Sequence, residues 1–197
     1  MQIYCKGGVC VKERFIKNTE GAIKLSLTTL LLIYSLVIAI VTKNLLIFLA
    51  MLLSTIGDIF IMTSRGCLKV IEGEENKQFE NGVVAFGMSH LLYIATLETE
   101  FSMKLFWCAV PVVVILVCLR FISNYELQLM ATYAVILLMN FANSIDYSWV
   151  AAVGAGLFIV SDGILAICEK RNPKWQIAIW ATYVPAQILL ITSTILK

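Results

Sequence analysis

The sequence predicts an all-α polytopic membrane protein, a bundle of seven transmembrane helices. Of its 197 residues, 60% are hydrophobic and only 14% are charged, which excludes an ordinary water-soluble domain. Apolar runs of bilayer-spanning length recur along the whole chain. Because the bilayer core admits only helices and closed barrels, and these runs lack the alternation of barrel strands, we expect helices throughout.

The seven apolar runs each have about the 17 to 25 residues that a bilayer requires. They cover residues 25–41, 44–63, 81–97, 105–122, 127–144, 148–168 and 175–196. The preceding residues 1–21 are a polar, basic tail, which leaves residues 22–197 as a single transmembrane domain. Since the tail has no apolar region, we expect no cleavable signal peptide, and the first helix serves as the insertion signal.

The distribution of basic residues predicts the orientation of the bundle. Twelve Lys and Arg residues fall on the side of the amino terminus and three on the other, so the amino terminus should be cytoplasmic. The membrane would be the cell membrane or the endoplasmic reticulum, depending on the organism. Three tryptophans lie near predicted helix ends as candidate interfacial anchors: Trp107, Trp149 and Trp175.

Several function classes have no support in the sequence. The six cysteines form no C-x-x-C pair and no metal-finger spacing, so we interpret them as reduced thiols. No phosphate-binding loop, Ser-His-Asp order or nucleic-acid motif occurs. We therefore expect no cofactor, no bound metal and no nucleic-acid partner, and the oligomeric state stays open.

The membrane-buried ionisable side chains gather at one depth. Counting from the cytoplasmic side, Asp58, His90 and Asp162 lie roughly 9 to 15 Å deep on three different helices. A lone carboxylate in the bilayer costs several kcal/mol, so these groups should share one interior cavity. Three uncharged polar residues fall in the same layer: Tyr133, Tyr183 and Gln187.

The opposite half of the membrane is expected to carry little polar chemistry beyond Asn140 and Asn143. Three readings of the polar layer compete with an active site. It could be a knot of interhelical hydrogen bonds that only holds the bundle together. One imidazole with two carboxylates could bind a divalent metal, and a relay of such groups could serve a proton-coupled transporter.

The order of short motifs over four of the helices extends this reading. The motif residues are Ser54, Thr55, Ile56, Gly57 and Asp58; Phe79, Gly82, Phe86, His90 and Tyr93; Gly154, Phe158, Ser161 and Asp162; and Thr182, Tyr183, Ala186 and Gln187. Over about residues 22–195 the chain resembles the YhhN family of membrane lysoplasmalogenases. That family usually has eight helices, and here the polar tail stands where its first helix would be. Lys24 matches the lysine of the family's Lys-Pro pair, and Leu25 replaces the proline.

The resemblance implies hydrolysis of the vinyl-ether bond of lysoplasmalogens, with water, to a fatty aldehyde and glycerophosphoethanolamine or glycerophosphocholine. This reaction needs a general acid and a base that directs water, and two carboxyl groups in different environments can divide these roles. By hypothesis Asp58 and Asp162 are the acid/base pair, and His90 orients one carboxyl or relays a proton. Which carboxyl is the acid, and which headgroup is preferred, stay open.

The residues predicted to bind the lysophospholipid are Lys24, Tyr93, Tyr133, Ser161, Tyr183 and Gln187. The Lys24 ammonium could meet the lipid phosphate, or it could simply orient the first helix. Tyr93 could hydrogen-bond the ether oxygen. Glycines 57, 82, 154 and 156 are interpreted as close-packing positions. Alternative functions are a proton-coupled small-molecule transporter and a non-catalytic lipid-binding membrane protein.

Overall fold

The computed structural model describes residues 5–6, 9–65, 74–97, 123–168 and 175–196, with the single positions 113, 117 and 120. For residues 5–6, 9–20 and 167–168 it describes the backbone alone. The elements are β1 (Cys5–Lys6), β2 (Val9–Cys10), α1 (Val11–Thr42), α2 (Leu45–Ser64), α3 (Glu75–Thr96), α5 (Tyr125–Tyr147), α6 (Trp149–Cys168) and α7 (Trp175–Ser193). The two short strands pair antiparallel, and the rest of the described fold is helical, as predicted.

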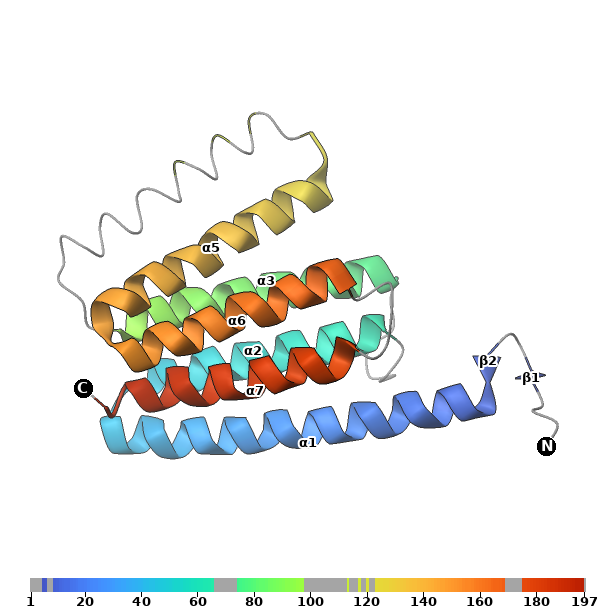
Figure 1. Cartoon of the computed structure of the whole chain (residues 1–197), viewed down its shortest axis with the longest axis horizontal. Helices are drawn as coiled ribbons and strands as arrows, with labels where there is room; N and C mark the ends of the chain where they lie inside the picture. Colours follow the sequence, from blue (N-terminus) through green and yellow to red (C-terminus); the bar gives the residue numbers. More distant parts are fainter. Residues whose placement is uncertain are drawn as a thin grey trace.

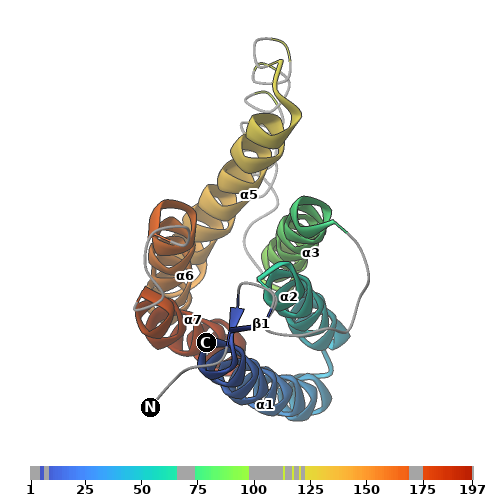
Figure 2. The same ribbon diagram turned by 90° about the vertical axis from the view of Figure 1, so that its right-hand side faces the viewer.

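The six described helices pack side by side as a closed ring (Figures 1 and 2). Each helix contacts the next in the order α1, α2, α3, α5, α6, α7, and α7 returns to contact α1. The amino-terminal end of α5 diverges from α3 in both views. This ring directs side chains from all six helices toward a common interior.

Within the part of the chain that the structure describes, five helices are long and apolar enough to cross a membrane, which makes the chain a multi-pass membrane protein. These spans are Gly21–Thr42, Leu45–Ser64, Tyr125–Tyr147, Trp149–Ala166 and Trp175–Ser193. They match five of the seven predicted runs. The run at 105–122 lies almost wholly outside the described residues, so the count of seven stays a prediction.

Two predicted boundaries differ from the structure. Helix α1 begins at Val11, well inside the segment predicted as a tail, although its apolar part begins at Gly21. Helix α3 forms as predicted but begins earlier, at Glu75, and is not among the helices apolar enough to span by composition alone. The reason is the polar start of the helix, where Glu75, Asn76, Lys77, Glu80 and Asn81 lower its mean hydropathy. Gln78, Ser89 and His90 add to this, although they are buried inside the ring.

Local signals set the turns that close the ring. Lys43 adopts a left-handed backbone conformation, with φ of 56°, between α1 and α2. The Asn44 side chain then accepts a hydrogen bond from the Leu46 amide at 3.1 Å and caps α2. Asn124 caps α5 in the same way through the amide of Leu127. These caps satisfy amides that the first turn of a helix leaves unpaired.

Three of the four predicted close-packing glycines have that role. A Cβ on Gly57 would lie 2.8 Å from the Phe86 ring and 3.2 Å from the Gly82 carbonyl oxygen, so α2 and α3 touch through both glycines. A Cβ on Gly154 would lie 3.0 Å from the backbone nitrogen of Leu190 in α7. The interpretation was wrong for Gly156, where the nearest atom would lie at an ordinary 3.4 Å.

We expect Gly57→Ala to lower the free energy of unfolding by about 1–3 kcal/mol, because its methyl group would overlap the Phe86 ring and a backbone oxygen. The matched control is Gly87→Ala on α3, whose Cβ would lie 3.7 Å from its nearest neighbours and should be neutral or slightly stabilising. Thermal unfolding of both variants in detergent measures the difference. Equal midpoints would contradict close packing at Gly57.

Candidate functional site

Asp58 is held at the interior face of α2 by a tyrosine from α7. Its side chain is buried, and Tyr183 donates a hydrogen bond to its Oδ2 at 2.7 Å. The Nε2 of Gln187 in turn donates to the Tyr183 hydroxyl at 3.2 Å, one helical turn away. The tyrosine therefore hydrogen-bonds Asp58 through its hydroxyl, and the glutamine helps to set the orientation of that hydroxyl.

The same glutamine links three helices into one buried network. Gln187 also donates to Ser54 at 3.1 Å, and its Oε1 accepts a 2.6 Å bond from the Tyr93 hydroxyl. Ser54 pairs with Ser89 at 2.7 Å, and Ser89 donates to the backbone oxygen of Ala50. The hydroxyl of Tyr93 is thus engaged with Gln187, which differs from the predicted contact with an ether oxygen.

Asp162 has a separate but similar partner. Tyr133 of α5 donates a hydrogen bond to Oδ2 of Asp162 on α6. The neighbouring Ser161 donates to the backbone oxygen of Ile179 at 3.2 Å and so ties α6 to α7. Each carboxyl group is therefore oriented by a tyrosine that comes from a different helix.

The two carboxyl groups line one small cavity inside the ring. Asp58 and Asp162 face it together with Ser161, Tyr183 and the basic residues Lys24 and Arg65. Its volume is about 30 Å³, and a polar cavity needs roughly 10–15 Å³ to hold a water molecule. Asp58 and Asp162 therefore share an interior cavity, as expected from the cost of placing a carboxylate in the bilayer. This cavity is large enough for a water molecule.

Lys24 and Arg65 converge on one side of this cavity. Both donate hydrogen bonds of 2.7 Å to the side-chain oxygen of Gln176. Lys24 is only 4% exposed, and its ammonium lies 5.6 Å from the centre of the Trp180 ring. Arg65 is one of the twelve basic residues that were counted in the sequence analysis for the orientation of the bundle. Its spacing was the missed signal, because it follows Asp58 by two helical turns on one face.

His90 is fully buried, and its described contacts are with groups other than the two carboxyls. Its Nδ1 pairs with the Asn140 side-chain amide at 2.9 Å, and its ring packs edge-on against Phe158 with centroids 4.4 Å apart. No bond joins it to Asp58 or Asp162 among the described residues, where its Nε2 also lacks a partner. The suggestion that His90 orients a carboxyl is therefore not supported.

Asn140 and Asn143, the polar residues expected in the opposite half of the membrane, are both fully buried, and Asn143 donates to the Ile94 backbone oxygen. Uncharged groups of this kind are cheaper than carboxylates to bury when they are hydrogen-bonded. Among the described residues, no three His, Cys, Asp or Glu side chains gather where a metal could bind.

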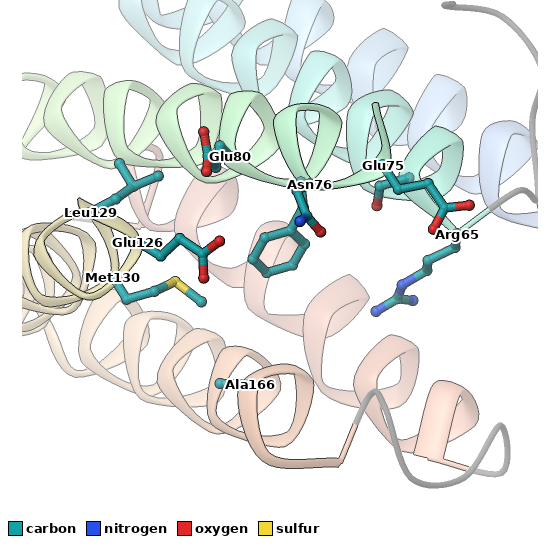
Figure 3. A pocket seen from close by; sticks show the side chains of 10 residues that line it. Arg65, Glu75, Asn76, Glu80, Glu126, Leu129, Met130 and Ala166 are labelled. Atoms are coloured by element: carbon teal, nitrogen blue, oxygen red, sulfur yellow. The ribbon is translucent and has the colours of Figure 1, made fainter. Parts of the chain in front are cut away.

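Two larger cavities adjoin the carboxyl pair. The first, about 360 Å³, is a charged mouth at the ends of α2, α3 and α5, shown in Figure 3. Its charged side chains are Arg65, Glu75, Glu80 and Glu126. The second, about 400 Å³, is an apolar chamber between α3, α5 and α6, where Asp162 and Tyr133 form part of the wall.

The described walls of these cavities are shared, which makes them neighbours. The mouth and the chamber share Phe79, Met130 and Ala166. The chamber and the small carboxyl cavity share Ile61, Phe86, Asp162 and Leu165. The apolar chamber thus adjoins both the charged mouth and the cavity that holds the two carboxyl groups.

Comparison with known proteins agrees with the motif reading. The model of the YhhN family matches residues 20–194, nearly the whole chain. The chain belongs to the YhhN family. No curated protein and no solved structure matches it. The YhhN match includes every motif residue quoted above and also Arg65 and Gln176.

We expect His90→Ala to lower the free energy of unfolding by about 2–4 kcal/mol, since it leaves a cavity and removes the partner of the Asn140 amide. The control is Met88→Ala on the same helix, where the side chain is 52% exposed. Thermal unfolding in detergent tests this. A midpoint equal to that of the control would show that His90 has no structural role.

Proposed function

We propose that this protein is a membrane hydrolase that cleaves the vinyl-ether bond of lysoplasmalogens. The observation that carries the proposal is the pair Asp58 and Asp162, on separate helices, facing a water-sized cavity beside an apolar chamber. An amphiphile with its labile bond just below the headgroup suits such a site. Membership of the YhhN family supports the same reaction.

In the proposed reaction, one protonated carboxyl donates its proton to the alkenyl carbon that is not bonded to oxygen. The adjacent carbon becomes an oxocarbenium ion, and the other carboxylate takes a proton from water as the water oxygen bonds to that carbon. In the collapse of the resulting hemiacetal, the carboxyl group that took the proton from water gives it to the glycerol oxygen, which leaves as an alcohol. The first carboxylate takes the proton of the hemiacetal hydroxyl, which becomes the aldehyde oxygen, so both carboxyl groups return to their starting states. One water is consumed and the protons are returned, so no cofactor is needed.

The tyrosines and Gln187 act as positioning residues in this proposal. Tyr183 and Tyr133 each donate to one carboxyl oxygen, which fixes the directions in which Asp58 and Asp162 present their other lone pairs. Gln187 donates a hydrogen bond to the Tyr183 hydroxyl, and Tyr93 donates one to Gln187. Oriented carboxyl groups reduce the reorganisation needed during proton transfer.

The headgroup phosphate is assigned to the basic side of the site. Arg65 borders both the mouth and the carboxyl cavity, and the buried Lys24 ammonium shares Gln176 with it. A phosphate could replace the Gln176 oxygen as acceptor for both cations. With the amino terminus cytoplasmic, the mouth would receive lipid from the cytoplasmic leaflet.

We expect Asp58→Asn and Asp162→Asn each to reduce aldehyde release from an alkenyl lysolipid by at least 100-fold, the lower range for losing a general acid or base. Both substitutions preserve side-chain size, so the elution volume and the thermal midpoint of each variant should stay near wild type. Full activity in both variants would exclude the carboxyl pair as the catalytic groups.

The same assay separates the rival functions. A transporter would accumulate a labelled metabolite in liposomes without releasing aldehyde, and a passive lipid-binding protein would bind lysolipid unchanged. Loss of activity in the presence of a strong chelator would favour a metal enzyme. Rates that are unchanged by the chelator support direct carboxyl catalysis.

We expect Arg65→Gln and Lys24→Gln to raise KM on the order of tenfold with a smaller change in kcat, because a charged hydrogen bond to phosphate contributes about 1.5–3 kcal/mol. The control is Lys43→Gln, an exposed lysine in the turn at the far end of α1. Kinetics on lysolipid in mixed micelles measure both constants. A KM unchanged in both variants would remove the phosphate assignment.

A further inference from the structure

The apolar chamber is larger than the chemistry of the carboxyl pair requires. Its volume of about 400 Å³ falls within the range of roughly 300–1,000 Å³ that is typical of small-ligand cavities. Its described lining is almost wholly apolar and comes from α2, α3, α5 and α6: Ile61, Phe79, Val83, Phe86, Met130, Ala134, Leu137, Leu138, Ile159, Leu165 and Ala166. Among the described residues, Tyr133 and Asp162 are the polar side chains of this lining, and they already hydrogen-bond each other. The lining therefore favours an apolar ligand over a sugar, a peptide or a nucleotide.

One glycine keeps the chamber open beside the carboxyl pair. Gly163 lines it and directly follows Asp162 in α6. A Cβ added to Gly163 would meet no atom of the described residues within 4 Å, whereas at Gly57 it would meet Phe86 at 2.8 Å. Close helix packing thus does not explain a glycine at 163, although glycine is a poor helix former.

We propose that the chamber binds the aliphatic chain of a single-chain lipid and that Gly163 is the specificity-determining residue that admits it. The space left by the missing side chain lets the chain pass Asp162 into the chamber. This inference rests on the proposed function and adds the binding mode. A hydrocarbon chain fits because the chamber adjoins a charged mouth on one side and the carboxyl cavity on another.

The position of Asp162 supports this assignment. Asp162 borders both the chamber and the small cavity that it shares with Asp58. With the chain in the chamber and the phosphate near Arg65, the first carbons of the chain would lie against Asp162. These are the carbons of the vinyl-ether bond, which the proposed chemistry protonates and hydrates.

The test is a series at position 163 in the full-length protein: Gly163→Ala, Gly163→Leu and Gly163→Phe. Aldehyde release is measured from alkenyl lysolipids of graded chain length, and binding from alkyl-ether lysolipids, which lack the double bond. We expect Gly163→Phe to lower the ratio of long-chain to short-chain lysolipid by about tenfold, both in binding affinity and in the rate of aldehyde release. The phenyl ring would fill part of the chamber and exclude the extra methylene groups of the long chain. Gly163→Leu should fall between, and Gly163→Ala should stay near wild type.

The matched control is Val160→Phe on the same helix, where the side chain is 49% exposed and is not part of the chamber lining. It should keep the wild-type chain-length profile. An unchanged profile in folded Gly163→Leu and Gly163→Phe overturns the chain assignment, even if the wild type releases aldehyde. If the wild type releases none while Gly163→Phe still weakens binding of the long alkyl lysolipid, the hydrolase proposal fails and the chain site stands.

Discussion

The structure depends on one constraint, the cost of leaving a carboxyl group unsatisfied in the interior of a membrane protein. Asp58 and Asp162 meet this constraint in the same way, each through a tyrosine hydroxyl from another helix. These bonds connect α2 with α7 and α5 with α6. The side chains proposed for the chemistry therefore also help to hold the helices in register, and local packing and reactivity share the same contacts.

The two carboxyl environments are similar but not equivalent. Asp58 lies at the end of a network that runs through Tyr183 and Gln187 to Ser54 and Ser89, all of it buried. Asp162 is less enclosed and borders the apolar chamber. The hydrogen-bonded network fixes the orientation of Asp58, while in the proposed binding mode Asp162 would lie against the lipid chain. This asymmetry is what an acid/base pair with divided roles requires.

Much of the fold was predictable because apolar runs of bilayer length have few structural options. The interior position of Asp58 and Asp162 followed from the cost of charge in lipid. The partners were not predictable in this way. His90 was expected beside the carboxyls, but helix rotation turns it toward Asn140, and depth alone does not reveal rotation. Arg65 was counted as a topological charge, although its spacing from Asp58 placed it on the same face.

The glycines illustrate the limit of reading function from residue type. Gly57 and Gly82 are required because two backbones touch, and the atoms they meet belong to neighbouring helices. Gly163 meets open space, so its contribution lies in the volume that it leaves beside Asp162. Sequence patterns treat both cases alike, since each glycine interrupts an apolar helix. The distinction depends on where the neighbouring side chains lie: a Cβ at Gly57 would meet Phe86 at 2.8 Å, whereas a Cβ at Gly163 would meet no described atom within 4 Å.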